Sequence, residues 1–233
     1  MKGKSRLGKR LFITGTGTDV GKTFISGLIV KKLLESGAKT AYFKAAMSGN
    51  DVGRDGRLIP GDAVAIQRLS GTTQSLESMC PFVYKNAVSP HLAARWEGRP
   101  FDLGVAERCL NRLCEEYDYV VIEGSGGIVC PLRYDDVERL LLVDLIQKWG
   151  TPCLLVADSG LGTINSATLT AWALAARRVP LRGVIFNRWT GDPMQEDNAL
   201  MCERLAETRV IAKVAEDATT LDLDLERLTD CFL

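Results

Sequence analysis

Residues 11–30 read LFITGTGTDVGKTFISGLIV. The apolar residues 11–13 predict the end of a β-strand, and residues 24–30 predict the first turns of a helix. The residues between them are mostly Gly and Thr, so several backbone N–H groups can turn inward around phosphate oxygens at a helix N-terminus, which favours anions. Lys22 adds a positive charge, and Thr23 adds a hydroxyl suited to Mg²⁺. The pattern is typical of a phosphate loop that binds a nucleotide. This interpretation is favoured over a turn without a ligand, because a strand is expected before the loop and a helix after it.

The loop is one residue longer than the common phosphate loop. The usual spacing, G-x-x-x-x-G-K-[ST], places its first glycine at position 16, but this chain has Thr16 there and Gly15 one residue earlier. The additional residue distinguishes this loop from the commonest form of the motif.

Composition and charge favour one globular domain. The chain has 233 residues, of which 46% are hydrophobic and 25% charged, enough for a core without disulfide or metal staples. We expect a single domain over residues 11–233, after a basic, flexible N-terminus over residues 1–10. Lys plus Arg and Asp plus Glu each number 29, so no overall field favours nucleic acid or an anionic membrane as a partner. The basic start lacks the apolar stretch of a signal peptide, and no later run could span a bilayer, which favours a cytoplasmic protein.

Apolar strands alternate with amphipathic helices along the chain. The expected strands cover residues 11–14, 40–44, 119–123, 153–158 and 183–187. The expected helices cover residues 23–36, 62–69, 103–116, 137–149 and 165–178. Such alternation predicts an α/β fold with a mostly parallel sheet and helices on both faces. Residues 48–61 and 71–101 are expected to be long active-site loops.

Polar groups stand where the expected strands end. They are the phosphate loop after Ile13, Lys44, Glu123, Asp158 and Asn187. Because ligands bind beyond the carboxyl ends of parallel strands, we expect these groups to converge on one edge of the sheet. Glu123 follows an apolar run, like the acid with which phosphate-loop enzymes hold Mg²⁺. Plainer interpretations are a solvated acid for Glu123, a surface lysine for Lys44 and a helix N-cap for Asp62.

Further motifs follow the extended loop in order: Tyr42-Phe43-Lys44-Ala45-Ala46-Met47-Ser48-Gly49, Gly61-Asp62-Ala63, Ser89-Pro90-His91, Glu123-Gly124-Ser125-Gly126-Gly127, Pro131-Leu132, Gly162-Thr163-Ile164-Asn165 and Asn187. Over residues 11–190 their order and spacing resemble the dethiobiotin synthetase family, whose members close the ureido ring in biotin biosynthesis with ATP. The resemblance implies a P-loop NTPase fold, an ATP-dependent synthetase and a homodimer.

The resemblance implies a role for each matching position. Nucleotide contacts are Gly17, Thr18, Asp19, Val20, Gly21, Lys22, Thr23, Glu123 and Asn187, the last reading the adenine edge. The Mg²⁺ ligands are Thr23, Asp62 and Glu123, and the catalytic residues are Lys22, Lys44 and Ser48. Diamine and carbamate contacts are Thr18, Asp19, Lys44, Ser48 and Gly126. The backbone N–H groups of Thr163, Ile164 and Asn165 are expected to bind the substrate carboxylate across the dimer interface. The additional loop residue would let Thr18 and Asp19 face the second substrate.

The implied reaction joins 7,8-diaminononanoate, CO₂ and ATP, with Mg²⁺ as cofactor. One amine captures CO₂ as a carbamate, ATP phosphorylates a carbamate oxygen, and the second amine attacks the mixed anhydride with loss of phosphate. Carbamate and triphosphate are both anions, so concentrated positive charge from Lys22, Lys44, Mg²⁺ and the loop amides is required. An amine with a reference pKa of about 10.4 is mostly protonated, and we expect the two lysines to lower its pKa by like-charge repulsion.

The chain departs from the family pattern at several positions. Ala45 follows Lys44 where the family has Pro, which makes the backbone less stiff. Residues 210–214 lack the Gly-x-Ile-Pro run that helps to wrap the nucleotide, so the sequence does not fix the purine base. Trp189 either stacks on the base or packs internally, with packing favoured. His91 in the Ser89-Pro90-His91 motif either lines the substrate pocket or only follows a helix start, with Ser89 as the cap and Pro90 in the first turn.

Other functional classes share this fold. A partitioning or metal-delivery ATPase would normally carry a second lysine early in its phosphate loop, where this chain has Thr16. An amidotransferase-type synthetase acting on corrin precursors carries an additional glutaminase domain, for which 233 residues leave no space. A non-catalytic nucleotide-binding module is the third alternative.

Overall fold

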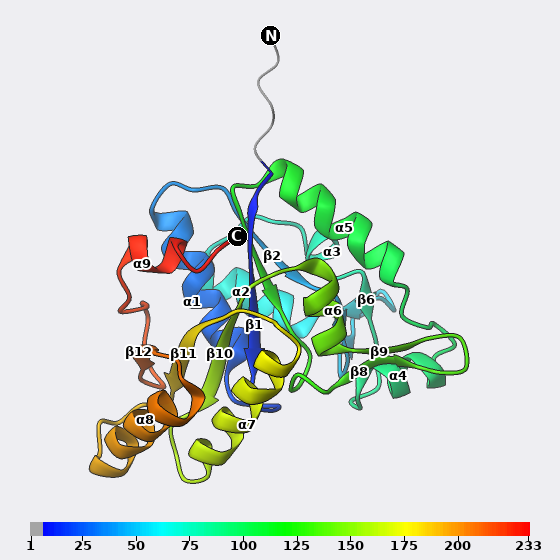
Figure 1. The fold of residues 1–233 in the computed structure, drawn as a ribbon. Coiled ribbons are helices and arrows are strands. Elements are labelled where there is room, and N and C mark those ends of the chain that lie inside the picture. Colours follow the sequence, from blue (N-terminus) through cyan, green and yellow to red (C-terminus); the bar gives the residue numbers. More distant parts are fainter. Residues whose placement is uncertain (1–6) are drawn as a thin grey trace.

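A six-stranded parallel sheet forms the centre of the computed structural model, which describes residues 7–233 (Figure 1). The strands lie in the order β12, β11, β10, β1, β7, β2, and each neighbouring pair is parallel. They are β1 (Lys9–Gly15), β2 (Thr40–Lys44), β7 (Tyr119–Glu123), β10 (Cys153–Asp158), β11 (Leu181–Asn187) and β12 (Val210–Val214). The predicted α/β fold with a parallel sheet is confirmed.

Helices cover both faces of the sheet. Successive strand residues point to opposite sides, so apolar side chains on both sides have to be covered. On one face, Leu154 and Val156 of β10 join the apolar cluster beneath the helices α1 (Lys22–Glu35), α2 (Gly61–Ser70) and α9 (Leu225–Thr229). The other face carries one cluster beneath α5 (Leu103–Glu116) and α6 (Leu142–Trp149), and another beneath α7 (Thr163–Ala176) and α8 (Pro193–Ala206). This two-sided burial explains why the central strands are almost entirely apolar.

Shorter elements lie outside the central sheet. The strand pairs are β3 (Ala46–Met47) with β6 (Phe82–Val83), β4 (Asp51–Val52) with β5 (Leu58–Ile59), and β8 (Pro131–Tyr134) with β9 (Arg139–Leu141). The short helices are α3 (Leu76–Met79) and α4 (Pro90–Trp96). The prediction of long loops over residues 48–61 and 71–101 is therefore wrong in part, since several of these elements lie within them.

The helix expected over residues 137–149 begins only at Leu142. Residues 139–141 instead pair with β8. The Asp144 carboxylate then accepts a hydrogen bond from the Leu141 backbone N–H at 2.9 Å, which fixes the start of α6. The helices α8 and α9 and the strand β12 are also missing from the predicted set.

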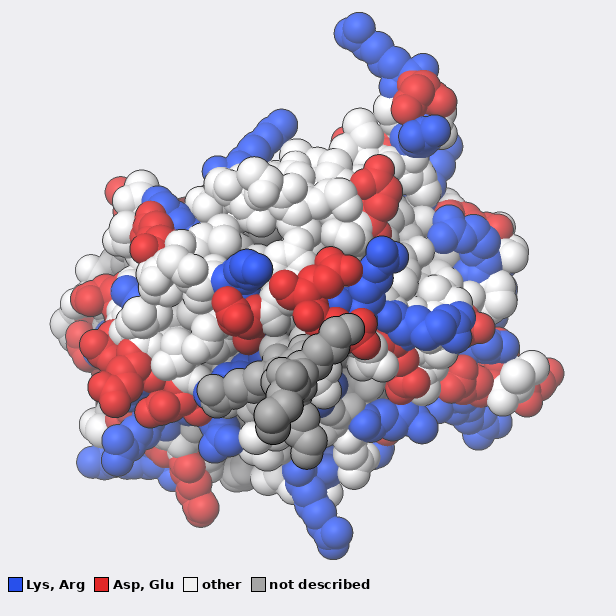
Figure 2. All heavy atoms as spheres, turned by 90° about the horizontal axis from the view of Figure 1, so that it is seen from above, with Lys and Arg blue, Asp and Glu red and all other residues white. Residues whose placement is uncertain are grey.

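Strand β1 begins at Lys9, inside the segment expected to be flexible. Arg10 exchanges two backbone hydrogen bonds with Leu233, of 2.7 and 3.0 Å, so the end of the chain holds this part of β1. Residues 1–6 of that expected segment lie outside the described residues. At this end of the molecule basic and acidic side chains are interspersed, as Figure 2 shows, in agreement with the balanced composition. Each helix in the described range is too short or too polar to cross a membrane.

Candidate active site

The phosphate loop connects β1 to α1. Gly21 has a φ of 93°, in the left-handed region that glycine tolerates, and an added Cβ there would collide with the side-chain amide of Asn187. The Asn187 Nδ2 donates to the Val20 carbonyl at 3.1 Å, so the end of β11 holds the loop from behind. Inside the loop, Lys22 Nζ donates to the Gly17 carbonyl at 2.6 Å. These contacts preorganise the loop around its own lysine.

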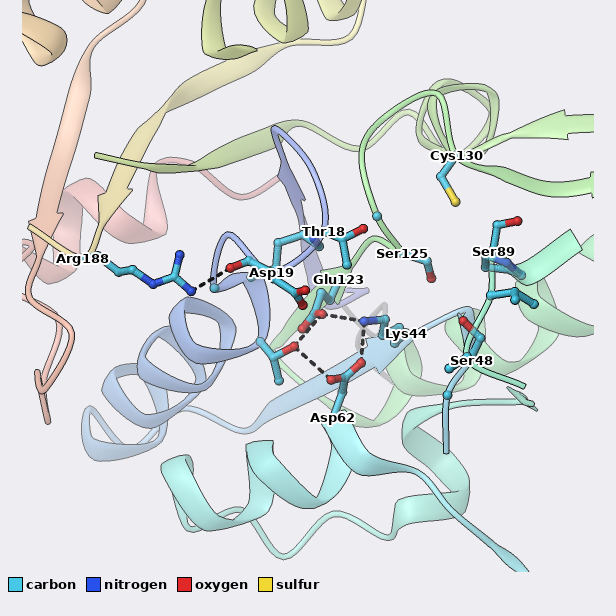
Figure 3. A pocket seen from close by; sticks show the side chains of 18 residues that line it. Thr18, Asp19, Lys44, Ser48, Asp62, Ser89, Glu123, Ser125, Cys130 and Arg188 are labelled. Atoms are coloured by element: carbon cyan, nitrogen blue, oxygen red, sulfur yellow. Dashed lines mark hydrogen bonds and ion pairs between the residues drawn. The ribbon is translucent and has the colours of Figure 1, made fainter. Parts of the chain in front are cut away.

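A cavity of about 990 Å³ lies beside this loop, where β2 and β7 also end (Figure 3). Ten of the residues predicted for the site line it: Thr18, Asp19, Gly21, Lys22, Thr23, Lys44, Ser48, Asp62, Glu123 and Gly126. Ligand pockets usually measure about 300–1,000 Å³. This cavity therefore lies at the upper end of the usual range.

Two carboxylates and a lysine meet in this cavity (Figure 3). Lys44 Nζ, at the end of β2, donates to Asp62 Oδ2 at 2.6 Å and to Glu123 Oε1 at 2.7 Å. Thr23 Oγ1, in the first turn of α1, lies 2.9 Å from Glu123 Oε1 and 3.2 Å from Asp62 Oδ1. Lys44 is 6% exposed and Glu123 is 2% exposed, so neither is the solvated side chain of the plainer interpretations. Helix α2 begins at Gly61 after Pro60, so Asp62 is not its N-cap.

The pKa values of the two lysines move in opposite directions. Burial acts to lower the pKa of Lys44, but the Glu123 and Asp62 carboxylates outweigh it and raise that pKa well above its usual range. Burial lowers the pKa of Lys22, and the positive charge of Lys44 lowers it further. Burial acts to raise the pKa of Asp62, but Lys44 and the Thr23 hydroxyl bring it below its usual range. Lys44 and Asp62 are thus held in their charged forms, whereas the charge on Lys22 is disfavoured.

The oxygen atoms of Thr23, Asp62 and Glu123 fit a shared Mg²⁺ site. Mg²⁺ prefers oxygen ligands, and it is usually bound by one or two carboxylates together with phosphate oxygens and waters. Residues 7–233 contain no group of three or more Asp, Glu, His or Cys that could hold an ion. The protein donors at this point are two carboxylates and one hydroxyl.

Several predicted site residues lie away from the cavity. Asn187 is buried behind the loop, at the end of β11. Asp158, expected at the same edge, forms an ion pair of 2.6 Å with Arg188 and does not line the cavity. Residues 163–165 begin α7 and do not line it either. Gly17 and Val20 contribute carbonyl groups to the loop's internal hydrogen bonds.

Arg188 and Ser125 line the cavity although they have no place in the predicted site. The Arg188 guanidinium bridges Asp158 and the phosphate loop, since its Nη2 donates to the Asp19 carbonyl at 2.8 Å. Ser125 Oγ donates to the Ala46 carbonyl at 2.6 Å and joins the segment after β7 to the one after β2. Nothing in the spacing of the sequence indicates either contact.

Trp189 is partly buried and packs against the apolar cluster that contains Phe186. Its ring lies 6.1 Å from that of Phe186, measured between centroids, and Lys213 Nζ lies 4.3 Å from its centroid. The Ser89-Pro90-His91 motif begins α4, as the helix-start interpretation has it, and it contributes Ser89 and Pro90 to the cavity. His91 does not line this cavity, so its interpretation as a residue of the substrate pocket is wrong. His91 instead turns toward Ser89 Oγ, with its Nδ1 at 3.0 Å, and lines a separate cavity of about 230 Å³.

Similar sequences extend over nearly the whole chain. The ATP-dependent dethiobiotin synthetase BioD of Brachyspira hyodysenteriae is 40% identical over 218 residues, which cover 93% of this chain and 96% of that protein. The chain belongs to the dethiobiotin synthetase family. A second dethiobiotin synthetase, from Clostridium novyi, is 40% identical over 205 residues, or 88% of this chain and 86% of its own. A family profile described as an AAA domain matches residues 9–221.

Solved structures that share the fold are more distant in sequence. The MinC:MinD cell division protein complex of Aquifex aeolicus matches with a TM-score of 0.55 at 15% identity, over 90% of this chain and 82% of that chain. Chloroplast FtsY of Physcomitrella patens matches with a TM-score of 0.55 at 17% identity, over 99% of this chain and 66% of that chain. At such identities the likeness concerns the fold alone. The P-loop NTPase fold implied by the resemblance to dethiobiotin synthetases is confirmed.

Proposed function

We propose that the chain is an ATP-dependent dethiobiotin synthetase, which closes a ureido ring on 7,8-diaminononanoate with CO₂ and converts ATP to ADP and phosphate. The observation that carries this proposal is the cavity in which the phosphate loop faces Lys44, Asp62 and Glu123. Its support from sequence is the 40% identity to a dethiobiotin synthetase over 93% of the chain.

The chemistry requires no protein nucleophile. One neutral amine attacks CO₂ and, after loss of a proton, becomes a carbamate. A carbamate oxygen attacks the γ-phosphorus of ATP and displaces ADP, and the second amine attacks the carbamate carbon. The carbon–oxygen bond to the phosphoryl group then breaks, so that phosphate leaves with one oxygen that came from CO₂. The ring closes within one molecule, where effective molarities reach about 10⁵ M or more, so the demanding step is activation of the carbamate.

Positive charge near the two anions must come from the protein and its metal together. The cluster of Lys22, Lys44, Asp62 and Glu123 contains two cations and two anions, so its formal charge is zero. Mg²⁺ held by Thr23, Asp62 and Glu123 would supply further positive charge to the β- and γ-phosphates. Lys44 can turn toward a carbamate only when its two carboxylates have another partner, and the proposed metal site provides one. Without the metal, the two carboxylates neutralise Lys44, and the expected lowering of the amine pKa would then depend mainly on Lys22.

The remaining cavity residues suit the diamine and the base. Thr18, Asp19, Ser48 and Gly126 lie near Lys44 in the same cavity and offer hydroxyl, carboxylate and backbone groups to an amine or its carbamate. Asn187 Oδ1 is buried and has no hydrogen-bond partner among the described residues. A buried acceptor of this kind has an unsatisfied preference for a donor. A contact with the exocyclic amine of adenine would require the Asn187 side chain to turn out from behind the loop.

A homodimer would complete the diamine site. Residues 163–165 lie outside the cavity, yet their N–H groups open α7, where a helix favours a carboxylate. The Thr163 N–H donates to the Gly160 carbonyl at 3.3 Å, which leaves Ile164 and Asn165 as the donors for substrate. Leu161, just before α7, is 92% exposed. Along the helix, Leu169 and Trp172 are also exposed, at the spacing of one helix face. We infer that this face meets a second copy and brings its α7 to the cavity.

Replacement of Leu169 by glutamate tests the dimer. A charge at the centre of an apolar interface must lose its water, so we expect the variant to sediment as a monomer and its KM for the diamine to rise at least about tenfold. Leu225→Glu, on α9, adds the same charge to a leucine remote from α7 and should leave both quantities unchanged. A dimeric Leu169→Glu protein with an unchanged KM would contradict the proposed arrangement.

Phosphate release from ATP in the presence of bicarbonate tests the function. We expect release to depend strongly on the diamine, because without an acceptor for CO₂ there is no carbamate to phosphorylate. Release at the same rate with and without the diamine would instead favour a switch ATPase.

A further inference from the structure

Tyr42 is completely buried beneath the active site, and its hydroxyl donates to Glu123 Oε2 at 2.9 Å. Tyr42 and Lys44 are two residues apart on β2, so their side chains leave the same face of the sheet. Glu123 stands directly opposite Lys44 on β7. The carboxylate is therefore held from two sides: Lys44 and Thr23 contact Oε1, whereas Tyr42 contacts Oε2.

The backbone of Tyr42 is fixed from outside the sheet. Strand β2 is an edge strand, so one side of it has no neighbouring strand. The buried side chain of Gln74 takes the place of a neighbour there: its Oε1 accepts the Tyr42 N–H at 2.8 Å, and its Nε2 donates to the Tyr42 carbonyl at 3.0 Å. Satisfying both groups of one residue with a single amide fixes the backbone from which the tyrosine side chain extends.

We propose that Tyr42 is a positioning residue that orients Glu123 so that Oε1, and not Oε2, faces the cavity as a metal ligand. A carboxylate at the end of a strand can rotate about its terminal bond, and both of its oxygens can compete for an ion. The Tyr42 hydroxyl removes that freedom, because one oxygen is engaged below the site. Groups that orient metal ligands in this way commonly change metal affinity by about 10- to 100-fold when removed.

The Tyr42 hydroxyl acts as a hydrogen-bond donor, because the carboxylate oxygen that it contacts is an acceptor. Burial and the negative charge of Glu123 both raise the pKa of Tyr42 well above its usual value, in agreement with that geometry. This inference rests on the proposed function in one respect, namely that Glu123 helps to hold Mg²⁺ beside the nucleotide.

Tyr42→Phe tests the proposal, with Tyr84→Phe as the matched control. Tyr84 is also completely buried, but its hydroxyl donates to the Arg99 carbonyl at 2.9 Å. The affinity for a non-hydrolysable ATP analogue is measured by calorimetry with Mg²⁺ and with EDTA, in the absence of diamine. We expect Tyr42→Phe to reduce the Mg²⁺-dependent gain in affinity by about tenfold and to leave the affinity in EDTA unchanged. Tyr84→Phe should keep the full gain.

The proposal would be overturned if Tyr42→Phe kept the full Mg²⁺-dependent gain in nucleotide affinity. It would also be overturned if the variant lost the same nucleotide affinity with and without Mg²⁺, because that result indicates a merely structural role. These binding measurements do not depend on turnover. A failure of the proposed function would instead be seen as diamine-independent phosphate release by the wild-type protein, so the two failures can be told apart. If Tyr42→Phe does not fold, the near-ultraviolet absorption spectrum of tyrosine in the wild-type protein and in Tyr84→Phe tests the proposal instead. Adding Mg²⁺ to the nucleotide complex should shift that spectrum equally in the wild-type protein and Tyr84→Phe, and no shift in either would contradict the role of Tyr42.

Discussion

Replacement of Lys22 by methionine should lower diamine-dependent phosphate release by about 100- to 1,000-fold, the usual effect of removing one charged or hydrogen-bonding group from a developing anion. At the same time we expect the nucleotide-free protein to become more stable, by about 1 kcal/mol. The first effect follows from the position of Lys22 in the phosphate loop and in the cavity. The second follows from its lowered pKa, since the folded protein disfavours this buried charge.

The sign of the stability effect can be checked with pH. Because the pKa of Lys22 is lower in the folded protein than in the unfolded chain, its penalty is present at neutral pH. The penalty disappears as the pH rises from the folded pKa toward the ordinary lysine value of about 10.4. Urea denaturation should thus show that the advantage of Lys22→Met shrinks with rising pH. Lys31→Met, which removes an amine that contacts Thr219 and Glu35 far along α1, should change neither turnover nor this pH dependence. A nucleotide-free Lys22→Met protein less stable than the wild type at neutral pH would contradict this interpretation.

Replacement of Lys44 by methionine should have the opposite effect on stability. Turnover should again fall by about 100- to 1,000-fold, but the free energy of unfolding should fall too, by about 3 kcal/mol, because removing one member of a buried ion pair leaves the other uncompensated. Glu123 is 2% exposed, so its charge gains little from water when Lys44 is absent.

The pH dependence of Lys44 also has the opposite sign. The pKa of Lys44 is raised in the folded protein, so its contribution is fully present below the ordinary lysine value of about 10.4 and is lost only as the pH rises through the folded pKa. At neutral pH we therefore expect Lys22→Met and Lys44→Met to shift the urea midpoint in opposite directions. Shifts of the same sign would show that the two lysines do not differ in their electrostatic surroundings.

The sequence was sufficient for the central strands because their burial on two faces leaves a plain apolar pattern. Edge elements are harder to predict. Strand β12 places Lys213 on its exposed side, and residues 137–149 contain leucines that suit a strand pair and a helix equally well. Helix α8 does carry a usable signal, since the Asp192 carboxylate accepts from the Gln195 N–H at 3.0 Å and Pro193 occupies the first turn.

In the active site, too, local patterns were predictable from the sequence and long-range contacts were not. The phosphate loop and the acid that ends β7 are local patterns, and both lie at the predicted edge of the sheet. The contacts among Lys44, Asp62 and Glu123 join segments distant in sequence, so spacing alone left each residue with a plainer interpretation. The resemblance to dethiobiotin synthetases indicated the residues of this cluster. The hydrogen bonds of Tyr42 to Glu123 and of Arg188 to the phosphate loop also join residues distant in sequence, so only the folded structure shows them.

The route of one oxygen atom tests the proposed chemistry most directly. In a short reaction with ATP, the diamine and CO₂ labelled with ¹⁸O, the released phosphate is analysed by mass spectrometry. If a carbamate oxygen is phosphorylated before the ring closes, the phosphate carries one labelled oxygen and appears in step with the cyclic product. Unlabelled phosphate, or phosphate formed without the cyclic urea, would contradict the mixed anhydride and with it the role proposed for this cavity.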